Sequence, residues 1–392
     1  MMRQRHSRIP MDITLDKLQE DDVASVARAL TSARADDPTV LDLRGMSSRS
    51  RSQSQLDFTA MTLLANLLLT SLRRKPLTVR IPSSGSVLQR MASAGLWFAL
   101  AQRGSTELLV EAEEGQLVTS VPAVARLDPW RGRWDPADRE FRSSVWGAGT
   151  SPYSGHFSTV SKTHIAFINP HLSVGRDRLV KELSDNVLSH WFEALEQRLD
   201  PEILSSAHEV VAELLYNLSV HPFSSIASRP PLQRDISKDQ RFGLVSLFVT
   251  SGGGGETLHI LVSDTGHGIP ATLRPKFRKS DQSGLGEDED LIRKMLEGSL
   301  PPYGRAEGRG FPELVSLGRR LGGSLTIATN ADRGISNTLV ADASTSGDIR
   351  VRQVPHFDIA GTIVHMVIGV NKKVDQGRSL GSPILEDSVL TV

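Results

Sequence analysis

The chain of 392 residues contains no cysteine. Disulfide bonds, thiolate metal sites, iron–sulfur clusters and cysteine nucleophiles are therefore excluded as a basis for its chemistry. The absence also agrees with a reducing compartment, and we expect a cytoplasmic protein.

The chain also has no excess of charge of either sign. Its 45 lysines and arginines balance 45 aspartates and glutamates, so the formal net charge at pH 7 is +0. No overall field therefore favours nucleic acid or an anionic membrane, and we expect neither as a partner.

Long hydrophobic runs are missing too. The most apolar stretch, residues 58–72, is interrupted by threonines and Asn66 and is shorter than a membrane span requires. The first ten residues are basic but lead into no apolar core, so we expect no secretory signal. Residues 58–72 instead predict a buried helix.

The residues that are present predict two folded domains. Hydrophobic residues make up 39% of the chain and charged residues 23%, and 392 residues exceed what one core usually serves. The first domain should cover residues 1–120, where strands and helices alternate as in a small parallel or mixed sheet with helices packed on it. We expect strands at 39–45, 76–82 and 106–114, and helices at 57–74 and 86–104.

Residues 121–170 are rich in proline, glycine and tryptophan and predict a linker. The second domain should cover residues 171–370, followed by a tail at 371–392. Within this domain we expect helices at 176–199, 202–221 and 311–321, and strands at 241–250, 257–264, 324–329 and 361–368.

Three polar side chains share one face of the helix predicted at 202–221. Glu213, Asn217 and His221 recur every fourth residue, beside an apolar stripe that would face a core. At a phosphate site, an amide oxygen ligates a hard cation while a carboxylate orients or deprotonates a nucleophile. Taken alone, the pattern is more typical of a solvated helix face.

A second pattern ends the strand at 257–264. Asp264 can accept a hydrogen bond from an exocyclic amine, and the glycines that follow let the backbone approach a planar ring closely. These are Gly266 and Gly268, followed by Ile269. An ordinary Asp-Gly turn at the end of a strand has the same appearance.

Two further features are weak when taken singly. Gly308, Arg309 and Gly310 precede a helix, where backbone N–H groups and the arginine can hold phosphate oxygens. A glycine-rich loop that merely caps the helix has the same letters. Thr362, near the start of the last strand, indicates nothing alone.

The order of these features resembles the GHKL superfamily, which includes histidine kinases, anti-sigma-factor serine kinases, gyrase, Hsp90 and MutL. The resemblance spans about residues 176–370 and implies an ATP-binding domain with a mixed sheet and helices on one face. It implies ATP and Mg²⁺ as ligands, with Glu213 as the general base and Asn217 on the metal. The implied nucleotide contacts are Asp264, Gly266, Gly268 and Ile269 at the adenine, Gly308, Arg309 and Gly310 at the triphosphate, and Thr362 beneath the base.

One position departs from this pattern. The family often continues Gly-x-Gly-Leu, whereas this chain has Gly310-Phe311-Pro312, which puts the contact between the lid and phosphate in question. Rival nucleotide sites are not found, because the sequence has neither a Walker-type loop nor a Gly-x-Gly-x-x-Gly after its first strand.

Members of the superfamily differ in their other parts. A sensor histidine kinase needs a phosphoacceptor histidine within a motif that neither His190 nor His208 has, so we expect both to be structural. Gyrase- and MutL-like clamps need a following transducer domain, and only a short tail follows residue 370. The stretch ELLYNLSVH at 213–221 looks closest to the anti-sigma-type kinases.

The N-terminal half resembles a STAS domain, the fold of anti-sigma-factor antagonists, in its stretches VLDLRG, LDFTAMTLLANLL and LTVRIP. Those antagonists carry a phosphorylated serine after an aspartate at the helix start. Here Asp57 is followed by Phe58 and Thr59, so the resemblance implies a docking module in which Thr59 is a poor candidate acceptor.

The prediction is therefore an α/β chain, with a smaller STAS-like α/β domain before a GHKL domain, acting as a regulatory protein in a bacterial cytoplasm. A protein target is the expected partner, and a homodimer is a candidate assembly. Two functions stay open. The chain either transfers the γ-phosphate of ATP to a protein Ser/Thr or to water, or it is an ATP-gated interaction protein with slow or no phosphoryl transfer.

Overall fold

The computed structural model describes residues 11–14, 20–32, 39–44, 58–69, 77–81, 91, 94–96, 99, 106–110, 153–158, 163–168, 189–196, 199–220, 243–252, 255–277, 285–300, 310–332, 337–343, 347–355, 357 and 359–370. Within these ranges, no helix combines the length and apolar character that crossing a membrane requires.

The N-terminal part forms a four-stranded sheet in which all neighbouring strands are parallel, in the order β1–β2–β3–β4. Its elements are β1 (Met11–Thr14), α1 (Glu20–Ser32), β2 (Thr39–Asp42), α2 (Phe58–Leu69), β3 (Leu77–Ile81) and β4 (Thr106–Val110). Parallel neighbours need crossover connections, and α1 and α2 lie in the first two of these. The three expected strands are present, whereas β1 and α1 were not expected.

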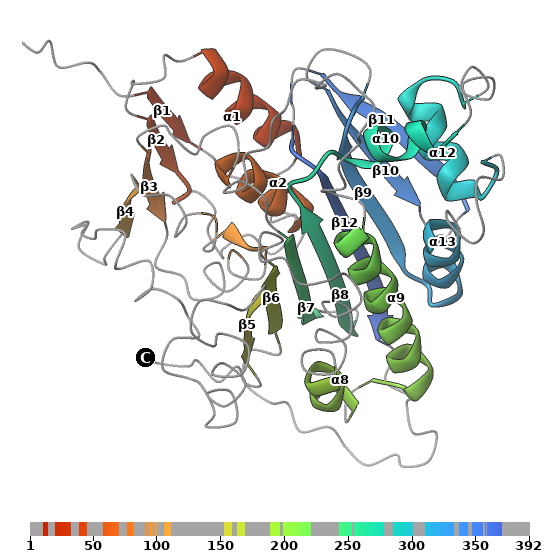
Figure 1. Ribbon diagram of the computed structural model, residues 1–392. Helices are drawn as coiled ribbons and strands as arrows, with labels where there is room; N and C mark the ends of the chain where they lie inside the picture. The colour runs from red at the N-terminus through yellow and green to blue at the C-terminus, as the bar shows by residue number, and fades with distance from the viewer. Residues whose placement is uncertain are drawn as a thin grey trace, which may run out of the picture.

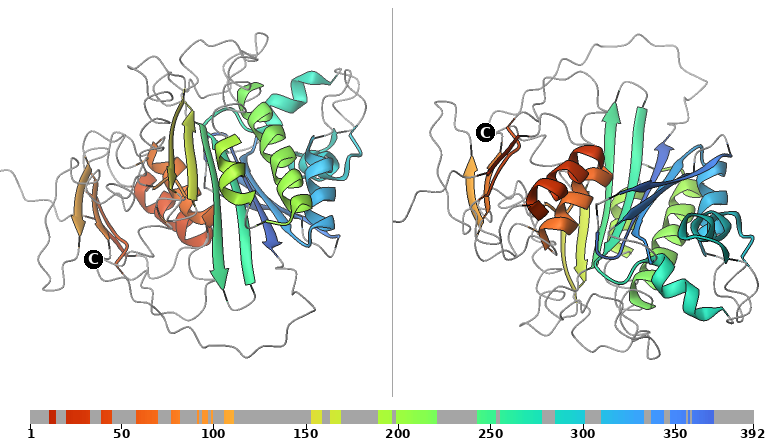
Figure 2. Two further views of the ribbon diagram at one scale, coloured as in Figure 1. Left: turned by 90° about the horizontal axis from the view of Figure 1, so that it is seen from below. Right: turned by 90° about the horizontal axis from the view of Figure 1, so that it is seen from above.

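Helix α2 is buried along its whole length. Figure 2 shows α1 and α2 between the small parallel sheet and a larger sheet. The leucines of α2 share one core with Leu244, Phe248, Leu261 and Ile363 of the larger sheet. Because α2 meets protein on all sides, its sequence is apolar all round.

The larger sheet has eight strands in the order β11–β10–β9–β12–β8–β7–β6–β5. Its strands are β5 (Tyr153–Ser158), β6 (Thr163–Ile168), β7 (Gly243–Gly252), β8 (Gly255–Asp264), β9 (Ser324–Asn330), β10 (Thr338–Ala343), β11 (Ile349–Val354) and β12 (Thr362–Val370). Every pair among these strands is antiparallel, so the expected mixed sheet is wrong. Strands β7 and β8 are joined by a short connection, which antiparallel pairing allows, and β12 lies between β8 and β9 and is antiparallel to both.

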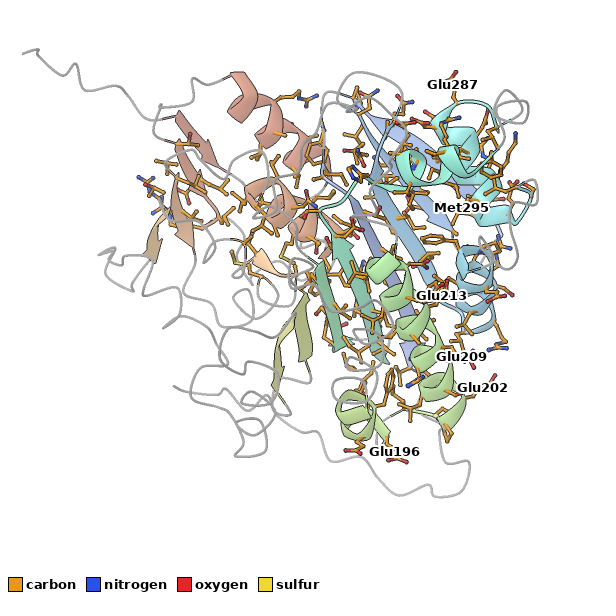
Figure 3. All side chains as sticks on the ribbon, viewed as in Figure 1. Glu196, Glu202, Glu209, Glu213, Glu287 and Met295 are labelled. Carbon is orange, nitrogen blue, oxygen red and sulfur yellow. The ribbon has the colours of Figure 1, made fainter. Side chains whose placement is uncertain are left out.

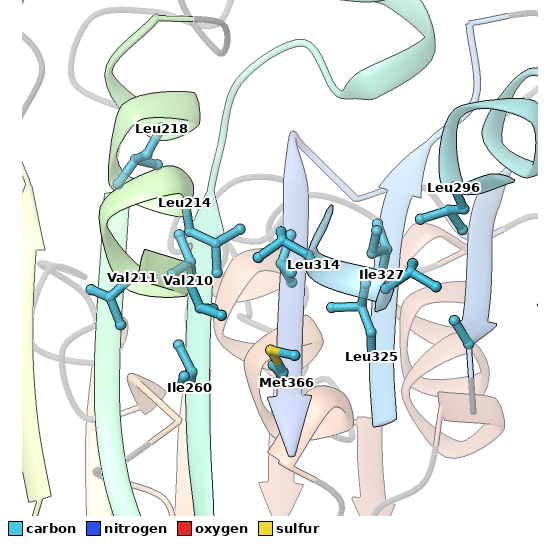
Figure 4. Close-up of a cluster of buried hydrophobic side chains, with 14 of the residues drawn as sticks. Val210, Val211, Leu214, Leu218, Ile260, Leu296, Leu314, Leu325, Ile327 and Met366 are labelled. Atoms are coloured by element: carbon cyan, nitrogen blue, oxygen red, sulfur yellow. The ribbon is translucent and has the colours of Figure 1, made fainter. Parts of the chain in front are cut away.

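One face of the larger sheet carries a layer of helices (Figures 1 and 2). They are α8 (Ser189–Glu196), α9 (Pro201–Val220), α10 (Ile269–Leu273), the 3₁₀ turn η6 (Arg274–Lys276), α12 (Asp288–Glu297) and α13 (Gly310–Arg320). Alternate residues of β8 face them, as Leu258, Ile260 and Val262 share a core with these helices. Figure 4 shows part of this core, with Val210 and Leu214 of α9 near Ile260.

Several elements lie where none was expected. The interval 121–170, predicted to be a linker, contributes β5 and β6 to the larger sheet, and its tryptophans lie outside the described residues, as do the tail at 371–392 and most of the helix predicted at 86–104. Helix α12 opens with Asp288, Glu289 and Asp290, which suit the positive end of a helix, and ends at Gly298 with φ 70°. Strands β10 and β11 complete the far edge of the sheet.

Candidate functional site

Helix α9 carries an acid–amide pair. Asn217 donates a hydrogen bond from Nδ2 to Oε1 of Glu213 at 3.0 Å, as their spacing of four residues allows. Both side chains are half-buried beside Val210 and Leu214, which are buried in the core. Burial raises the pKa of Glu213, and the nearby carboxylate of Glu313 raises it further against the lowering effect of Asn217. A carboxylate with a raised pKa is suited to accept a proton.

The first residue of α13 lies against that carboxylate. A Cβ added to Gly310 would overlap Oε1 of Glu213, so a larger residue here would have to displace the carboxylate. Figure 3 shows Glu213 on the side of α9 that faces α13. Helix α13 continues through Phe311 and Pro312, since proline in the first turn forfeits no helical hydrogen bond. The structure thus brings Gly310 together with Glu213.

Asp264 is the last residue of β8 and is buried. It has the same parity as Leu258, Ile260 and Val262, so its side chain leaves the sheet on the face that carries α9. Gly266 donates its backbone N–H to Oδ1 of Asp264 at 2.7 Å, and Thr362 also donates its backbone N–H to the carboxylate. Burial nonetheless dominates and raises the pKa of Asp264 to about 7.

Glycines allow the backbone to pass close to this carboxylate. Gly361 has φ 79°, and a Cβ there would overlap the carbonyl oxygen and Oδ1 of Asp264. Gly268 has φ 82°, and a Cβ there would overlap Oδ1 of Asn330 and lie 2.8 Å from Oγ1 of Thr329. Both positions therefore favour glycine.

Two threonines complete a group at the ends of three adjacent strands. Thr362 of β12 is paired with Thr329 of β9, and their hydroxyl oxygens lie 3.3 Å apart. Oγ1 of Thr329 also accepts a hydrogen bond from the backbone N–H of Ile269 at 2.9 Å. The alternation of β9 and β12 directs both threonines to the same face as Asp264. We refer to Asp264, Thr329 and Thr362 as the strand-end group.

The acid–amide pair and the strand-end group lie on the same side of the sheet. Figure 1 shows α9 and β8 side by side and running in the same direction. The last turns of α9, which carry Asn217, are therefore nearest the end of β8 that carries Asp264. Helix α13 packs on α9, β9 and β12 and closes the third side.

A buried ion pair holds the segment that follows Asp264. Arg274 is fully buried and donates from Nη2 to Oδ1 of Asp288 at 2.6 Å and to the carbonyl of Gly286 at 3.0 Å. The other carboxylate oxygen of Asp288 accepts the backbone N–H of Asp332 at 2.7 Å. These contacts join η6, α12 and the end of β9 into one rigid unit beside the strand-end group.

Some predicted residues are not placed. Gly308, Arg309 and His221 lie outside the described residues, and so does the side chain of His190. His208 is exposed, and the centroid of its ring lies 4.9 Å from that of Phe192.

Oxygen donors near Glu213 fit a hard cation. The Nδ2 of Asn217 points to Glu213, which leaves its Oδ1 as the natural ligand atom, and Glu213 and Glu313 add carboxylates. In the described part of the chain there is no group of three or more histidine, aspartate or glutamate side chains placed to hold a metal. A metal there would need ligands from a substrate, as Mg²⁺ usually has when it is bound with phosphate.

Four residues at or beside this site were not expected from the sequence: Asn66, Glu313, Thr329 and the close-packed Gly361. Only Asn66 had a signal, since an amide within an apolar helix must find buried partners.

Comparison of the chain with models of known protein families found no match, and no curated protein matched it either.

Proposed function

We propose that this chain binds ATP together with Mg²⁺ between α9, α13 and the ends of β8, β9 and β12, as a GHKL-type domain would. The observation that carries the proposal is the meeting of three features on one face of the sheet. These are the buried carboxylate of Asp264, the acid–amide pair of Glu213 and Asn217, and the glycine start of α13 against Glu213.

In this proposal the adenine binds at the strand-end group. Its exocyclic amine donates to the carboxylate of Asp264, and the hydroxyls of Thr329 and Thr362 are within reach of the ring nitrogens or of a water that bridges to them. Gly266, Gly268 and Gly361 have no side chains to block the ring. The buried setting strengthens a hydrogen bond to a charged acceptor relative to one in water.

The triphosphate would then extend toward α9 and α13. Asn217 would hold the Mg²⁺, which neutralises charge on the phosphate oxygens when bound. Glu213 would take the proton of a protein Ser/Thr hydroxyl or of water as that oxygen bonds to the γ-phosphorus and the bond to the ADP oxygen breaks. The raised pKa of Glu213 suits that role.

The second candidate is an ATP-gated interaction protein with slow or no transfer. The contact between α2 of the STAS-like half and the backbone of Asp264 favours it, because it connects the N-terminal half to the proposed adenine position. Under either function we propose a regulatory role with a protein partner.

Calorimetry with Mg·ATP tests the proposal. The chain should bind Mg·ATP, and Asp264→Asn should bind it at least about tenfold more weakly. Asp342→Asn is a matched control, because Asp342 accepts a hydrogen bond from Thr326 elsewhere in the same sheet and should leave binding unchanged. Absence of binding by the unaltered chain would remove the proposal.

Labelled ATP then separates the two functions. Incubation with a cell extract should place label on another protein if the chain is a kinase, and should release labelled phosphate if it is an ATPase. Both signals should disappear in Glu213→Ala. Binding without either product would favour the ATP-gated protein.

A further inference from the structure

Asn66 is a buried amide at the middle of the interface between α2 and the larger sheet. Its relative exposure is 2%, and it lies in a helix whose neighbouring side chains are mostly leucine and alanine. Helix α2 covers the face of the sheet opposite to α9 (Figure 2). Asn66 therefore contacts backbone atoms of the sheet from the face opposite to the strand-end group.

The hydrogen bonds of Asn66 to Ala360 and Asp264 go to backbone atoms that flank the strand-end group. Its Nδ2 donates to the carbonyl of Ala360 at 2.6 Å and to the carbonyl of Asp264 at 3.2 Å. Its Oδ1 accepts the backbone N–H of Ala360 at 3.1 Å. One side chain thus joins the end of β8 to the segment that leads into β12.

These two backbone segments set the surroundings of the Asp264 carboxylate. Ala360 is followed by Gly361, whose Cα lies against Asp264, and by Thr362, whose N–H donates to the carboxylate. A displacement of Ala360 would carry both residues with it. Three consecutive residues, Ala360, Gly361 and Thr362, therefore connect Asn66 to the carboxylate of Asp264.

We propose that Asn66 is a positioning residue through which α2 sets the shape of the adenine position, so that the N-terminal half regulates nucleotide affinity. The inference rests on the proposed function, because it concerns the same site. By linkage, a nucleotide that favours the aligned backbone also favours the docked position of α2. A protein partner that displaces α2 would change nucleotide affinity through the same contact of Asn66.

A second polar contact of α2 lies away from the strand-end group. Oγ1 of Thr59 and Nδ1 of His365 lie 3.1 Å apart, and Nε2 of His365 lies 3.1 Å from Nδ1 of His259. Nε2 of His259 continues to Oγ1 of Thr250 at 2.8 Å. This chain of contacts anchors α2 across β12, β8 and β7, several residues along the strands from Asp264 and Thr362. Buried Thr59 is consequently a docking residue in the structure.

The two contacts supply a matched pair of variants in the full-length chain. Asn66→Leu keeps approximate size and removes the hydrogen bonds to Ala360 and Asp264, while Thr59→Val keeps size and removes the contact with His365 in the same interface. Calorimetry should show Mg·ATP binding weakened at least about tenfold by Asn66→Leu and changed less than about twofold by Thr59→Val. Equal effects of the two variants, or none from Asn66→Leu, would overturn the inference.

The pH dependence of binding gives a readout that simple loss of stability would not move. Without Asn66, the N–H of Thr362 is no longer held on the carboxylate, so the acid midpoint of Mg·ATP binding should rise in Asn66→Leu and stay unchanged in Thr59→Val. Other titratable groups nearby are Glu213 of α9, on the same face, and His259 of β8 and His365 of β12, on the opposite face. Burial keeps the pKa of His365 at about 4, so His365 is neutral throughout. An unchanged midpoint in Asn66→Leu counts against the positioning role.

Should Asn66→Leu fail to fold, the unaltered chain decides the question. Amide hydrogen exchange in α2 should slow when Mg·ATP is added, because the two sites are linked. If bound Mg·ATP leaves the rate of amide hydrogen exchange in α2 unchanged, the inference is overturned, while the proposed function is not affected. A chain that binds no Mg·ATP would remove the proposed function itself.

Discussion

The Cα of Gly310 lies against the carboxylate of Glu213, so the start of α13 and the acid of α9 meet with no side chain between them. This relationship joins two segments almost one hundred residues apart in the sequence. It also places the positive end of a helix beside a carboxylate, which is a favourable arrangement. The proposed phosphate position is built from this contact.

Gly310→Ala should therefore impair the proposed reaction. The added Cβ overlaps Oε1 of Glu213, so either the carboxylate or α13 must move, and phosphate release should fall by about tenfold or more, as misplaced catalytic groups usually cost. Gly369→Ala is the control, because a Cβ there meets nothing within 4 Å. Steady-state phosphate release measures both variants, and equal rates would contradict the assignment of Gly310.

Glu213→Ala should bind Mg·ATP normally and lose turnover. Removal of a general base typically costs 10²- to 10⁴-fold, about 3–5 kcal/mol of transition-state stabilisation. Glu209→Ala removes an exposed carboxylate one turn earlier on α9 and should leave turnover unchanged (Figure 3). Single-turnover assays at saturating ATP distinguish the two. Continued turnover in Glu213→Ala would take the base role away from it.

Asp264→Asn should weaken nucleotide binding even though it preserves shape. A charge-assisted hydrogen bond worth roughly 1.5–3 kcal/mol is replaced by an amide that can present a donor to the adenine amine. Calorimetry with Mg·ATP should therefore show an affinity at least about tenfold lower. Affinity equal to that of the unaltered chain would refute the adenine contact.

The same variant should change how stability depends on pH. The pKa of Asp264 is raised from 3.8 to about 7 by burial, so the folded state holds the proton more tightly than the unfolded state. The stabilising effect of that proton is complete below pH 4 and is lost as pH rises through 7. Asparagine does not titrate. Without nucleotide, the unaltered chain should therefore lose roughly 3 kcal/mol of unfolding free energy relative to Asp264→Asn as the pH rises from 5 to 8.

Urea unfolding at the two pH values measures this shift. Asp342→Asn serves as the comparison, because it removes a carboxylate from the same sheet outside the strand-end group. A difference between the unaltered chain and Asp264→Asn that stays constant across pH would show that the carboxyl of Asp264 titrates normally.

Asp288→Ala should destabilise the fold more than any surface charge deletion. It leaves the fully buried guanidinium of Arg274 without its closest carboxylate and the N–H of Asp332 without its acceptor. Breaking a buried pair in this way costs about 3–5 kcal/mol. Asp290→Ala breaks only an exposed pair with Arg293 and should cost less than about 1 kcal/mol. Thermal unfolding ranks the two, and similar melting temperatures would show that the buried pair contributes little.

Sequence patterns located four of the eight strands of the larger sheet, β7, β8, β9 and β12. The period of α9 is strong because the helix buries one face, and the apolar runs of β8 and β12 are strong because both faces of each strand are buried. Strand β11 was missed because it lies at the edge of the sheet and mixes arginine and glutamine with valine and isoleucine. The pairing of β5 and β6 with β7 was hidden within a segment whose glycine and proline content indicated a linker.

The amino-acid sequence alone determined where each functional side chain lies within its own helix or strand. Spacing of four placed Glu213 and Asn217 on one helix face, and an apolar run ending in Asp264 placed a carboxylate at a strand end, because both are local consequences of backbone geometry. Only the tertiary structure decided which parts meet. Antiparallel register brought Thr362 beside Thr329, and packing of α2 brought Asn66 behind Asp264. Contacts between distant segments depend on how whole faces bury one another, and no local pattern encodes that.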